Sequence, residues 1–546
     1  ISNSQTISLS GEFNLVSLYN KSKYLRGING ENTPGGKKKP TPSKVPKPKS
    51  LEEGSKNELK KKAKESERNT SRIPTLAEKI LIRPLMSVRR IQFNYSENNS
   101  TIIPGFMQSP ELLGMDNSFV APGWKFVAGL KPDLKPGGYL DQIASKGWIT
   151  DNKYFNREMI QRHATTAGAK VRLELFKNFN IDVNIDRNFT RDYTETFKFD
   201  SVLGSSNQLA FQHFTPFENG QFTISYVSFQ SMFTKDINKL FNSFSEMRKT
   251  MSRRVGEQYG ITQRSTVNPD YIDGFLGDHQ DVVLPAFLAT YSHANPEKSN
   301  LDIFKTIPLP NWQINYSGLS RLEGMKNIFQ DFSIRHAYKN TLTMNNYRTN
   351  LDYRENVLEV PIRRKGDTII ASYYAQYEIP EISINESFGP LIGINVKTKN
   401  GIELGFDLNK TRNLQLKNGI EGQLEERNST NYTFKAGYVI KNVYLSFIPG
   451  VKKMQKKATK KKKKGEDPKE ATANKPKGND LVISVDFGIR DNISKLFRLD
   501  ENIEAQAFEG SKQINFTPSV QYNVNKSLNL RLFVDYSKSI PYVQNS

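Results

Sequence analysis

The chain of 546 residues lacks cysteine altogether and has only five histidines. Without cysteine it can form no disulfide bond and carry out no thiol chemistry. Neither an HExxH motif nor a close histidine cluster occurs, so we expect no metal site. The sequence also lacks a GxSxG elbow, a Walker loop and a GxGxxG fingerprint. We therefore predict that the protein is not an enzyme and has no catalytic residues and no cofactor.

Long hydrophobic runs are missing as well. No stretch of about 18 residues is apolar throughout, so we expect no transmembrane helix, although a membrane β-barrel would show no such stretch either. The N-terminus has no signal-peptide pattern, and its segment ISLSGEFNLVSLYN already has the character of a strand. We expect the chain to be a fragment that begins within a fold.

The excess of positive over negative charge lies mostly in two segments. The formal net charge is +22, of which residues 31–72 contribute +7 and residues 452–477 contribute +9. Both segments are rich in Lys, Pro and Gly, a composition typical of disordered, solvated loops. Binding of nucleic acid or of another acidic surface is the alternative interpretation of these segments.

Alternation of apolar and polar residues is the main pattern that is present. In LNLRLFVDY (Leu528–Tyr536) the apolar residues occupy every second position, and Asn, Arg and Asp lie between them together with one Phe. A period of two predicts a β-strand with one apolar and one polar face. Two environments fit it: a soluble sheet with one face on a core, or a membrane barrel with lipid outside and water inside. The same alternation recurs in FNIDVNIDR, GIELGFDLNK, NYTFKAGYVI, LVISVDFGIRD and INFTPSVQYNV.

Other segments predict further elements. A strand is expected at Ile7–Tyr19, a short helix at Leu76–Arg83 and an amphipathic helix at Lys235–Glu257. The segment FTISYVSF (Phe222–Phe229) precedes that amphipathic helix, and a long loop is expected over residues 259–310.

Several long motifs resemble the SprA/Sov family, whose members form the giant outer-membrane translocon of the type 9 secretion system and are linked to gliding motility. The resemblance runs almost end to end, except for the two Lys-rich segments. The motifs are STIIPGFMQSPELLGMD (Ser100–Asp116), APGWKFVAGLK (Ala121–Lys131), QDVVLPAFLATYS (Gln280–Ser292), IPLPNWQINYSGLSRL (Ile307–Leu322), FSIRHAYK (Phe332–Lys339), PEISINESFGPLIGINVKTKNG (Pro380–Gly401), DFGIRDN (Asp486–Asn492) and SLNLRLFVDYSKSIPYV (Ser527–Val543).

This resemblance implies an all-β fold, namely the C-terminal part of a very large antiparallel transmembrane β-barrel with extracellular cap loops that contain short helices. It implies a protein-conducting channel in the bacterial outer membrane that exports folded cargo. The implied partners are secreted cargo proteins with a C-terminal secretion signal domain, a PorV-type partner barrel, a periplasmic plug protein and outer-membrane lipid, but no nucleic acid. Family members continue past Ser546 into one more strand, which fits the expectation of a fragment.

Within such a barrel the polar side of each strand would line the lumen and the apolar side would face lipid. The residues expected to face the lumen are Asp182, Asn184, Asp186, Glu403, Asp407, Asp486, Arg490, Asn529, Arg531 and Asp535. Those expected to face lipid are Val183, Ile185, Val485, Phe487, Leu530, Leu532 and Val534.

The barrel interpretation also divides the chain into segments. Barrel strands are expected at 1–30, 73–100 (after a short helix), 159–199, 311–451 and 480–546, with the final strand missing. Extracellular segments are expected at 101–158 and at 200–310, where FTISYVSF and the amphipathic helix would lie above the membrane; the inner face of the barrel mouth is a second position for that helix. Periplasmic Lys-rich loops are expected at 31–72 and 452–479, because strand directions alternate.

Two other functions fit parts of the pattern. A porin or TonB-dependent-type receptor barrel for small ligands would show the same alternating strands. A soluble β-sandwich surface adhesin would show them too, but with domain linkers every ~100 residues, and none are apparent.

Overall fold

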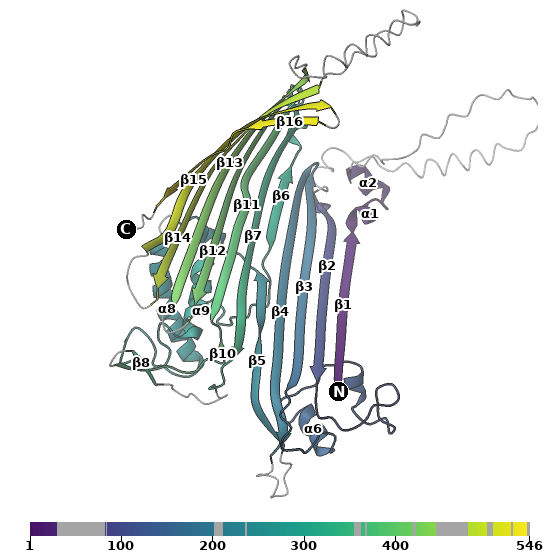
Figure 1. Cartoon of the computed structure of the whole chain (residues 1–546), viewed down its shortest axis with the longest axis vertical. Coiled ribbons are helices and arrows are strands. Elements are labelled where there is room, and N and C mark those ends of the chain that lie inside the picture. The colour runs from purple at the N-terminus through teal and green to yellow at the C-terminus, as the bar shows by residue number, and fades with distance from the viewer. Residues whose placement is uncertain are drawn as a thin grey trace, which may run out of the picture.

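The computed structural model describes residues 1–29, 82, 84–200, 211–234, 237–353, 362–365, 368–418, 422–443, 479–499, 506–525 and 528–542. A sheet of 15 strands dominates it, and neighbouring strands in this sheet pair antiparallel (Figure 1). The expected all-β, antiparallel fold class is therefore confirmed. Among the described residues, no helix has both the length and the apolar character needed to cross a membrane.

The long strands follow one another across the sheet in chain order. They are β1 (Ser2–Asn14), β2 (Val88–Ile102), β3 (Met159–Phe176), β4 (Phe179–Phe199), β5 (Phe211–Ser225), β7 (Phe329–Thr349), β11 (Glu381–Thr398), β12 (Ile402–Lys417), β13 (Gln423–Val443), β14 (Asn479–Arg498), β15 (Gln506–Asn525) and β16 (Leu528–Phe533). Short strands β6 (Asn311–Tyr316), β10 (Tyr377–Glu378) and β17 (Tyr536–Pro541) complete the sheet, and β8 (Ile362–Lys365) pairs with β9 (Thr368–Ala371) in a separate hairpin.

One strand position is shared by two segments that are distant in sequence. Between β4 and β7, β5 fills one half and β6 fills the other, because each pairs with both neighbours. The residues between them, 226–310, leave the sheet and return to it. The start of FTISYVSF, Phe222 to Ser225, belongs to β5, so part of the segment 200–310, for which only extracellular loops and a helix were expected, forms a strand of the sheet. Its Phe222 and Ile224 are buried under the returning helices, which is why they continue the apolar alternation.

Helices are few and lie mostly in the connections. They are α1 (Leu15–Tyr19), α2 (Lys23–Asn29), α5 (Trp124–Val127), α6 (Tyr139–Ser145), α7 (Phe229–Met232), α8 (Ile237–Gln258), α9 (Gln280–Tyr291) and the 3-10 turn η2 (Leu319–Arg321). The amphipathic helix expected at Lys235–Glu257 corresponds to α8. The strand expected to reach Tyr19 ends at Asn14, whose side chain accepts a hydrogen bond from the amide of Ser17 and so caps α1. The helix expected at Leu76–Arg83 lies, except for Ile82, outside the described residues.

The two ends of the sheet differ in their connections. At one end, called here the turn end, β3 joins β4 through Lys177 and Asn178, and β11 joins β12 through residues 399–401. β1 and β13 also end there, and β2 and β14 begin there, so the strands that precede and follow the Lys-rich segments 31–72 and 452–479 in the chain have their adjoining ends at this end. These segments themselves lie almost wholly outside the described residues. The longer connections 103–158 and 350–380 lie at the opposite end, the loop end (Figure 1).

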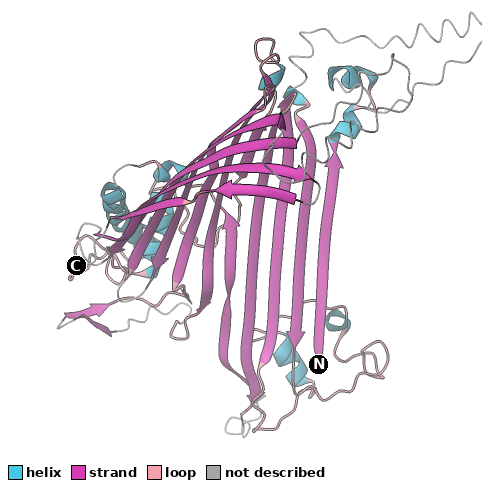
Figure 2. Ribbon diagram, turned by 45° about the horizontal axis from the view of Figure 1, so that its top comes forward, coloured by secondary structure: helices cyan, strands magenta, loops and turns pink. Residues whose placement is uncertain are grey.

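Helices α8 and α9 lie against one face of the sheet near the loop end, whereas α1 and α2 lie at the turn end, after β1 (Figures 1 and 2). Helices α8 and α9 form the largest buried cluster with residues from β5, β7, β11, β12, β13 and β14. The connection 103–158, with α5 and α6, forms a second buried cluster against β3 and β4. The core of the molecule is therefore a layer between the sheet and these connections.

Candidate functional site: the two faces of the sheet

The register of the strands assigns each side chain to one face, because directly paired residues of antiparallel strands project from the same side. Phe406, Phe434, Phe487 and Phe516 are paired in turn across β12, β13, β14 and β15. The neighbouring row on the other face begins with Asp407, which pairs with Thr433, and Thr433 in turn pairs with Gly488. One face is thus apolar and the other polar across these strands.

All seven residues expected to face lipid share the apolar face. Val183 pairs with Trp312 of β6, Leu532 pairs with Val520 of β15, and the Val534 amide donates to the Pro518 carbonyl, which continues the register between β16 and β17. The ten residues expected to face the lumen share the polar face by the same register. The structure therefore brings each set together on one side of the sheet.

The apolar face is divided into two halves along the strands. Towards the turn end many of its side chains are uncovered, with Leu404 49% and Leu532 73% exposed, apart from a small buried cluster in which Tyr522 and Val524 pack against Val443 and Leu481. Near the loop end, Leu414 and Leu416 of the same strand β12 and the same face are fully buried under the helices. We call the uncovered half the apolar band. Among its exposed members are Ile7, Leu9, Phe13, Ile402, Leu404, Tyr432, Phe434, Tyr438, Ile483, Phe516, Val520, Leu528, Leu530, Leu532 and Val534.

Aromatic rings pack against one another along the middle of the apolar band. The ring centroids of Phe406 and Phe434 are 4.8 Å apart, and those of Phe434 and Phe487 are 6.1 Å apart. Beside them lies an open groove of about 400 Å³, bordered by Ile394, Val396 and Leu404 among others. Contiguous apolar surface of this kind is rare on soluble monomers and indicates contact with a membrane or a partner.

A buried ion pair marks the border between the two halves. Arg412 and Glu386 are both fully buried, with Arg412 Nη2 2.6 Å from Glu386 Oε2. Arg412 Nη2 also donates to Ser231 Oγ of α7 at 2.7 Å, and the hydroxyl of Tyr338 donates to Glu386 Oε1 at 2.6 Å. Since Ser228 donates to the same carboxylate, at 3.1 Å, this network fixes the start of the helical layer to the sheet.

Sequence reasoning missed this ion pair. Glu386 and Arg412 occupy positions of the apolar phase in β11 and β12, where a charged residue interrupts the alternation. Such an interruption on the apolar side was a usable signal, because a charge there must be buried with a partner.

The polar face is held by many exposed ion pairs and hydrogen bonds. Arg335 Nη2 lies 2.8 Å from Asp407 Oδ1, and Arg172 Nε lies 2.9 Å from Asp182 Oδ1. Lys397 pairs with Glu403 across the β11–β12 turn. Each buried apolar cluster in the described chain takes its strand residues from the opposite, apolar side. In the described chain, the polar face therefore contributes no side chains to the buried apolar clusters.

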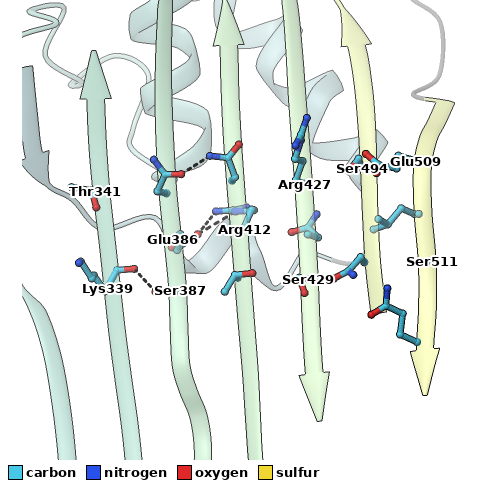
Figure 3. A pocket seen from close by; sticks show the side chains of 18 of the residues that line it. Lys339, Thr341, Glu386, Ser387, Arg412, Arg427, Ser429, Ser494, Glu509 and Ser511 are labelled. Carbon is cyan, nitrogen blue, oxygen red and sulfur yellow. Dashed lines mark hydrogen bonds and ion pairs between the residues drawn. The ribbon is translucent and has the colours of Figure 1, made fainter. Parts of the chain in front are cut away.

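A hollow of about 890 Å³ opens on the polar face (Figure 3). Polar side chains from β7 to β15 line it, among them Lys339, Asn413, Arg427 and Glu509. No group of three or more His, Asp or Glu side chains that could hold a metal ion occurs in the described part of the chain. A surface of this composition offers hydrogen bonds and charges to a polar ligand or to water.

The described sheet is curved and has two unpaired edges. β1 pairs only with β2, and β16 and β17 pair only with β15. The last strands lie across the direction of the first ones (Figure 2), as the right-handed twist of a large sheet requires.

Comparison with known proteins does not assign this chain to a family. No family model and no curated protein matches the chain. Among solved structures, the crystal structure of the ferric-catecholate import receptor Fiu from E. coli K12, in its closed form, is similar with 7% identity and a TM-score of 0.21. The match covers 84% of this chain and spans 56% of the length of that structure. A similarity this weak carries no argument about function.

Proposed function

We propose that this chain forms part of the wall of an outer-membrane β-barrel, with the apolar band in the bilayer and the polar face towards a water-filled pore. The observation that supports this most is the division of one sheet face into an uncovered and a covered half. In β14 the residues on this face are apolar from Leu481 to Ile489, up to the charged Asp491, and this span of nine residues is close to the roughly 9–11 residues that a tilted strand needs to cross a bilayer.

The polar face supports a wide pore. In a narrow barrel the inner side chains fill the interior, whereas a large barrel leaves an aqueous channel. Here the polar face carries exposed ion pairs and a hollow instead of a packed core. An antiparallel sheet with one charged and unpacked face is what a large water-filled barrel needs.

We propose further that the pore conducts proteins, as the outer-membrane channel of the type 9 secretion system, which exports folded cargo and supports gliding motility. This finer proposal rests on the resemblance of the long motifs to the SprA/Sov family. The proposed partners are cargo proteins with a C-terminal secretion signal domain, a PorV-type barrel and a periplasmic plug protein. The chain would act without enzymatic chemistry and without a cofactor.

Site-specific cross-linking tests this function directly. The chain has no cysteine, so single cysteines can be placed on either face. Asn413→Cys on the polar hollow and Leu404→Cys on the apolar band form a matched pair on one strand. In cells that secrete a cargo carrying the signal domain, we expect the cargo to cross-link to the Asn413→Cys variant and not to the Leu404→Cys variant. A channel for small ligands would give no cargo adduct at either position.

The direction of the chain in the membrane follows from the same proposal. Short turns usually face the periplasm and long loops the outside, so the turn end would be periplasmic and the connections 103–158 and 226–310 extracellular. The Lys-rich segments would then lie in the periplasm, where they could attract acidic partners in a salt-sensitive way. Protease added to intact cells should leave them uncut; cleavage within 456–464 from outside would reverse the orientation.

The helix α8 would lie outside the pore on this proposal. It packs against the apolar face of the sheet, and this packing supports the outer side of the wall over the second position expected for this helix, the inner face of the barrel mouth. The helical layer would sit above the bilayer, on the outer side of the wall, where it covers apolar strand residues that extend beyond the lipid.

A further inference from the structure

The connection 103–158 displays an unusual number of bulky apolar side chains. Leu112 is 60% exposed, Leu113 68% and Trp124 54%, and Phe119, Val120 and Leu130 are exposed as well. We call these six residues the apolar loop cluster. Scattered exposed apolar residues are normal, but six within 19 positions of one connection indicate a contact surface.

This cluster is held in a fixed shape. The Asp116 carboxylate accepts hydrogen bonds from the amides of Val120 and Ala121, at 2.8 and 3.0 Å, and from the Ser118 hydroxyl. The rings of Phe119 and Trp124 stack with centroids 6.2 Å apart and an angle of 13°. These contacts fix the backbone at residues 116–121 and hold the rings of Phe119 and Trp124 against each other while both stay exposed.

Two members of the cluster have strained backbones. Leu113 and Phe119 each have a φ of 55°, a left-handed conformation that residues with a Cβ rarely adopt because the Cβ approaches the following carbonyl oxygen. Residues in such conformations are kept there by the surrounding contacts, and they occur most often at functional sites. Leu113 and Phe119 thus combine a strained backbone with an exposed apolar side chain.

The cluster adjoins the apolar band. Asn3 Nδ2 donates to the carbonyls of Phe126 and Leu130, at 2.9 and 3.2 Å, and Gln5 Nε2 donates to the Ala128 carbonyl at 3.2 Å. Ile7, the first exposed residue of the apolar band on β1, follows Gln5 on the same face by two residues, roughly 7 Å along the strand. The loop thus continues the apolar band at its border.

We infer that the apolar loop cluster inserts into the interfacial region of the outer leaflet beside the barrel wall. This inference rests on the proposed membrane position of the apolar band. Trp prefers the interface because its ring is apolar and its N–H is polar. The cluster would anchor the wall at the height where the bilayer ends, with its Leu side chains among the upper parts of the acyl chains and Trp124 at the headgroups.

Lipid-borne quenchers test the insertion. Single cysteines at three exposed sites are labelled with a polarity-sensitive fluorophore. They are Leu112→Cys in the cluster, Leu404→Cys in the apolar band, and, as the control from the same connection, Ser145→Cys at the exposed last residue of α6. The whole chain is kept in its surrounding lipid, in polymer-bounded discs, and spin-labelled lipids are added. We expect a spin label near the headgroup to quench the fluorophore at position 112 more than a deep one, and the fluorophore at position 404 to respond to the deep label.

The outcomes separate the two proposals. A fluorophore at position 112 that behaves like the control at 145, while the one at 404 is quenched, would overturn the insertion and leave the membrane position of the band intact. A fluorophore at 112 that is shielded from aqueous iodide but not quenched by lipid would also overturn it, in favour of a protein partner. Absence of quenching at 404 would overturn the membrane position itself and the insertion with it.

Discussion

Leu404 and Leu416 lie in the same strand, β12, and on the same face, yet one is 49% exposed and the other fully buried. Near the loop end, protein helices supply the apolar surroundings that such residues need. Near the turn end no helix of the described chain covers the side chains of the apolar band, although they are as apolar as those near the loop end. The comparison teaches that one face of this sheet is built for two surroundings, a protein layer and, on our proposal, a bilayer.

The largest effect is expected where the two halves meet. Glu386→Ala leaves the fully buried Arg412 without its charge partner, which should destabilise the protein by about 3–5 kcal/mol. The free energy of unfolding in urea, with the chain in detergent, measures this. The double variant Glu386→Leu with Arg412→Met removes both charges and should recover most of the loss. A single variant as stable as the wild type would contradict the assignment of this pair as the attachment of the helical layer.

A matched pair of truncations compares the halves themselves. Leu416→Ala should cost about 2–5 kcal/mol because it leaves a cavity between the sheet and the helices. Leu404→Ala should cost clearly less, since lipid or detergent can fill the space. The comparison uses the same unfolding assay. Equal losses at both sites would mean that Leu404 also packs against a protein layer.

Introduced charges sharpen the contrast between the two faces. Val485→Arg and Leu530→Arg place a cation in the apolar band and should cost about 2–4 kcal/mol in membrane assembly if the band lies in lipid. Ser484→Arg and Asn529→Arg, on the polar face of the same strands, should be nearly neutral. The fraction of heat-modifiable, folded protein in the membrane gives the readout. Similar damage from both pairs would refute the assignment of the faces.

The smallest effect is expected on the polar face. Arg335 and Asp407 are both partly exposed, so Arg335→Ala should change stability by only about 0.2–1 kcal/mol. High salt should reduce the effect further, because solvent screens the pair. A loss of several kcal/mol would indicate that this face is buried against another part of the assembly.

The sequence predicted the strands and their faces well. Alternation in GIELGFDLNK and LVISVDFGIRD assigns Asp407 and Asp486 to one side and Val485 and Phe487 to the other, and the register agrees. This succeeds because the period of two is a local property of the backbone and needs no knowledge of tertiary contacts. The position of α8 was also readable, since its apolar residues recur with helical spacing.

Tertiary packing decided the elements that the sequence did not predict. Helix α9 lies within residues 259–310, where a long loop was expected. The sequence did not indicate this helix because Val282–Tyr291 is buried on all sides and so shows no helical alternation of apolar and polar residues, and because Pro285, a helix-breaking residue, lies inside it. β5 and β6 share one strand position only because both find partners in β4 and β7, which are distant in sequence. The hollow on the polar face likewise gathers residues from strands far apart, so no local pattern indicates it.

The central claim is that the apolar band meets lipid and the polar face meets water. Spin labels placed one at a time on cysteines along β12, from Ile402 to Asn409, test it most directly, because collisions with oxygen report lipid and collisions with a polar nickel complex report water. We predict that oxygen accessibility peaks at 402, 404, 406 and 408, and that nickel accessibility peaks at 403, 405, 407 and 409. Nickel access to both sets, without alternation, would contradict the membrane position of the band.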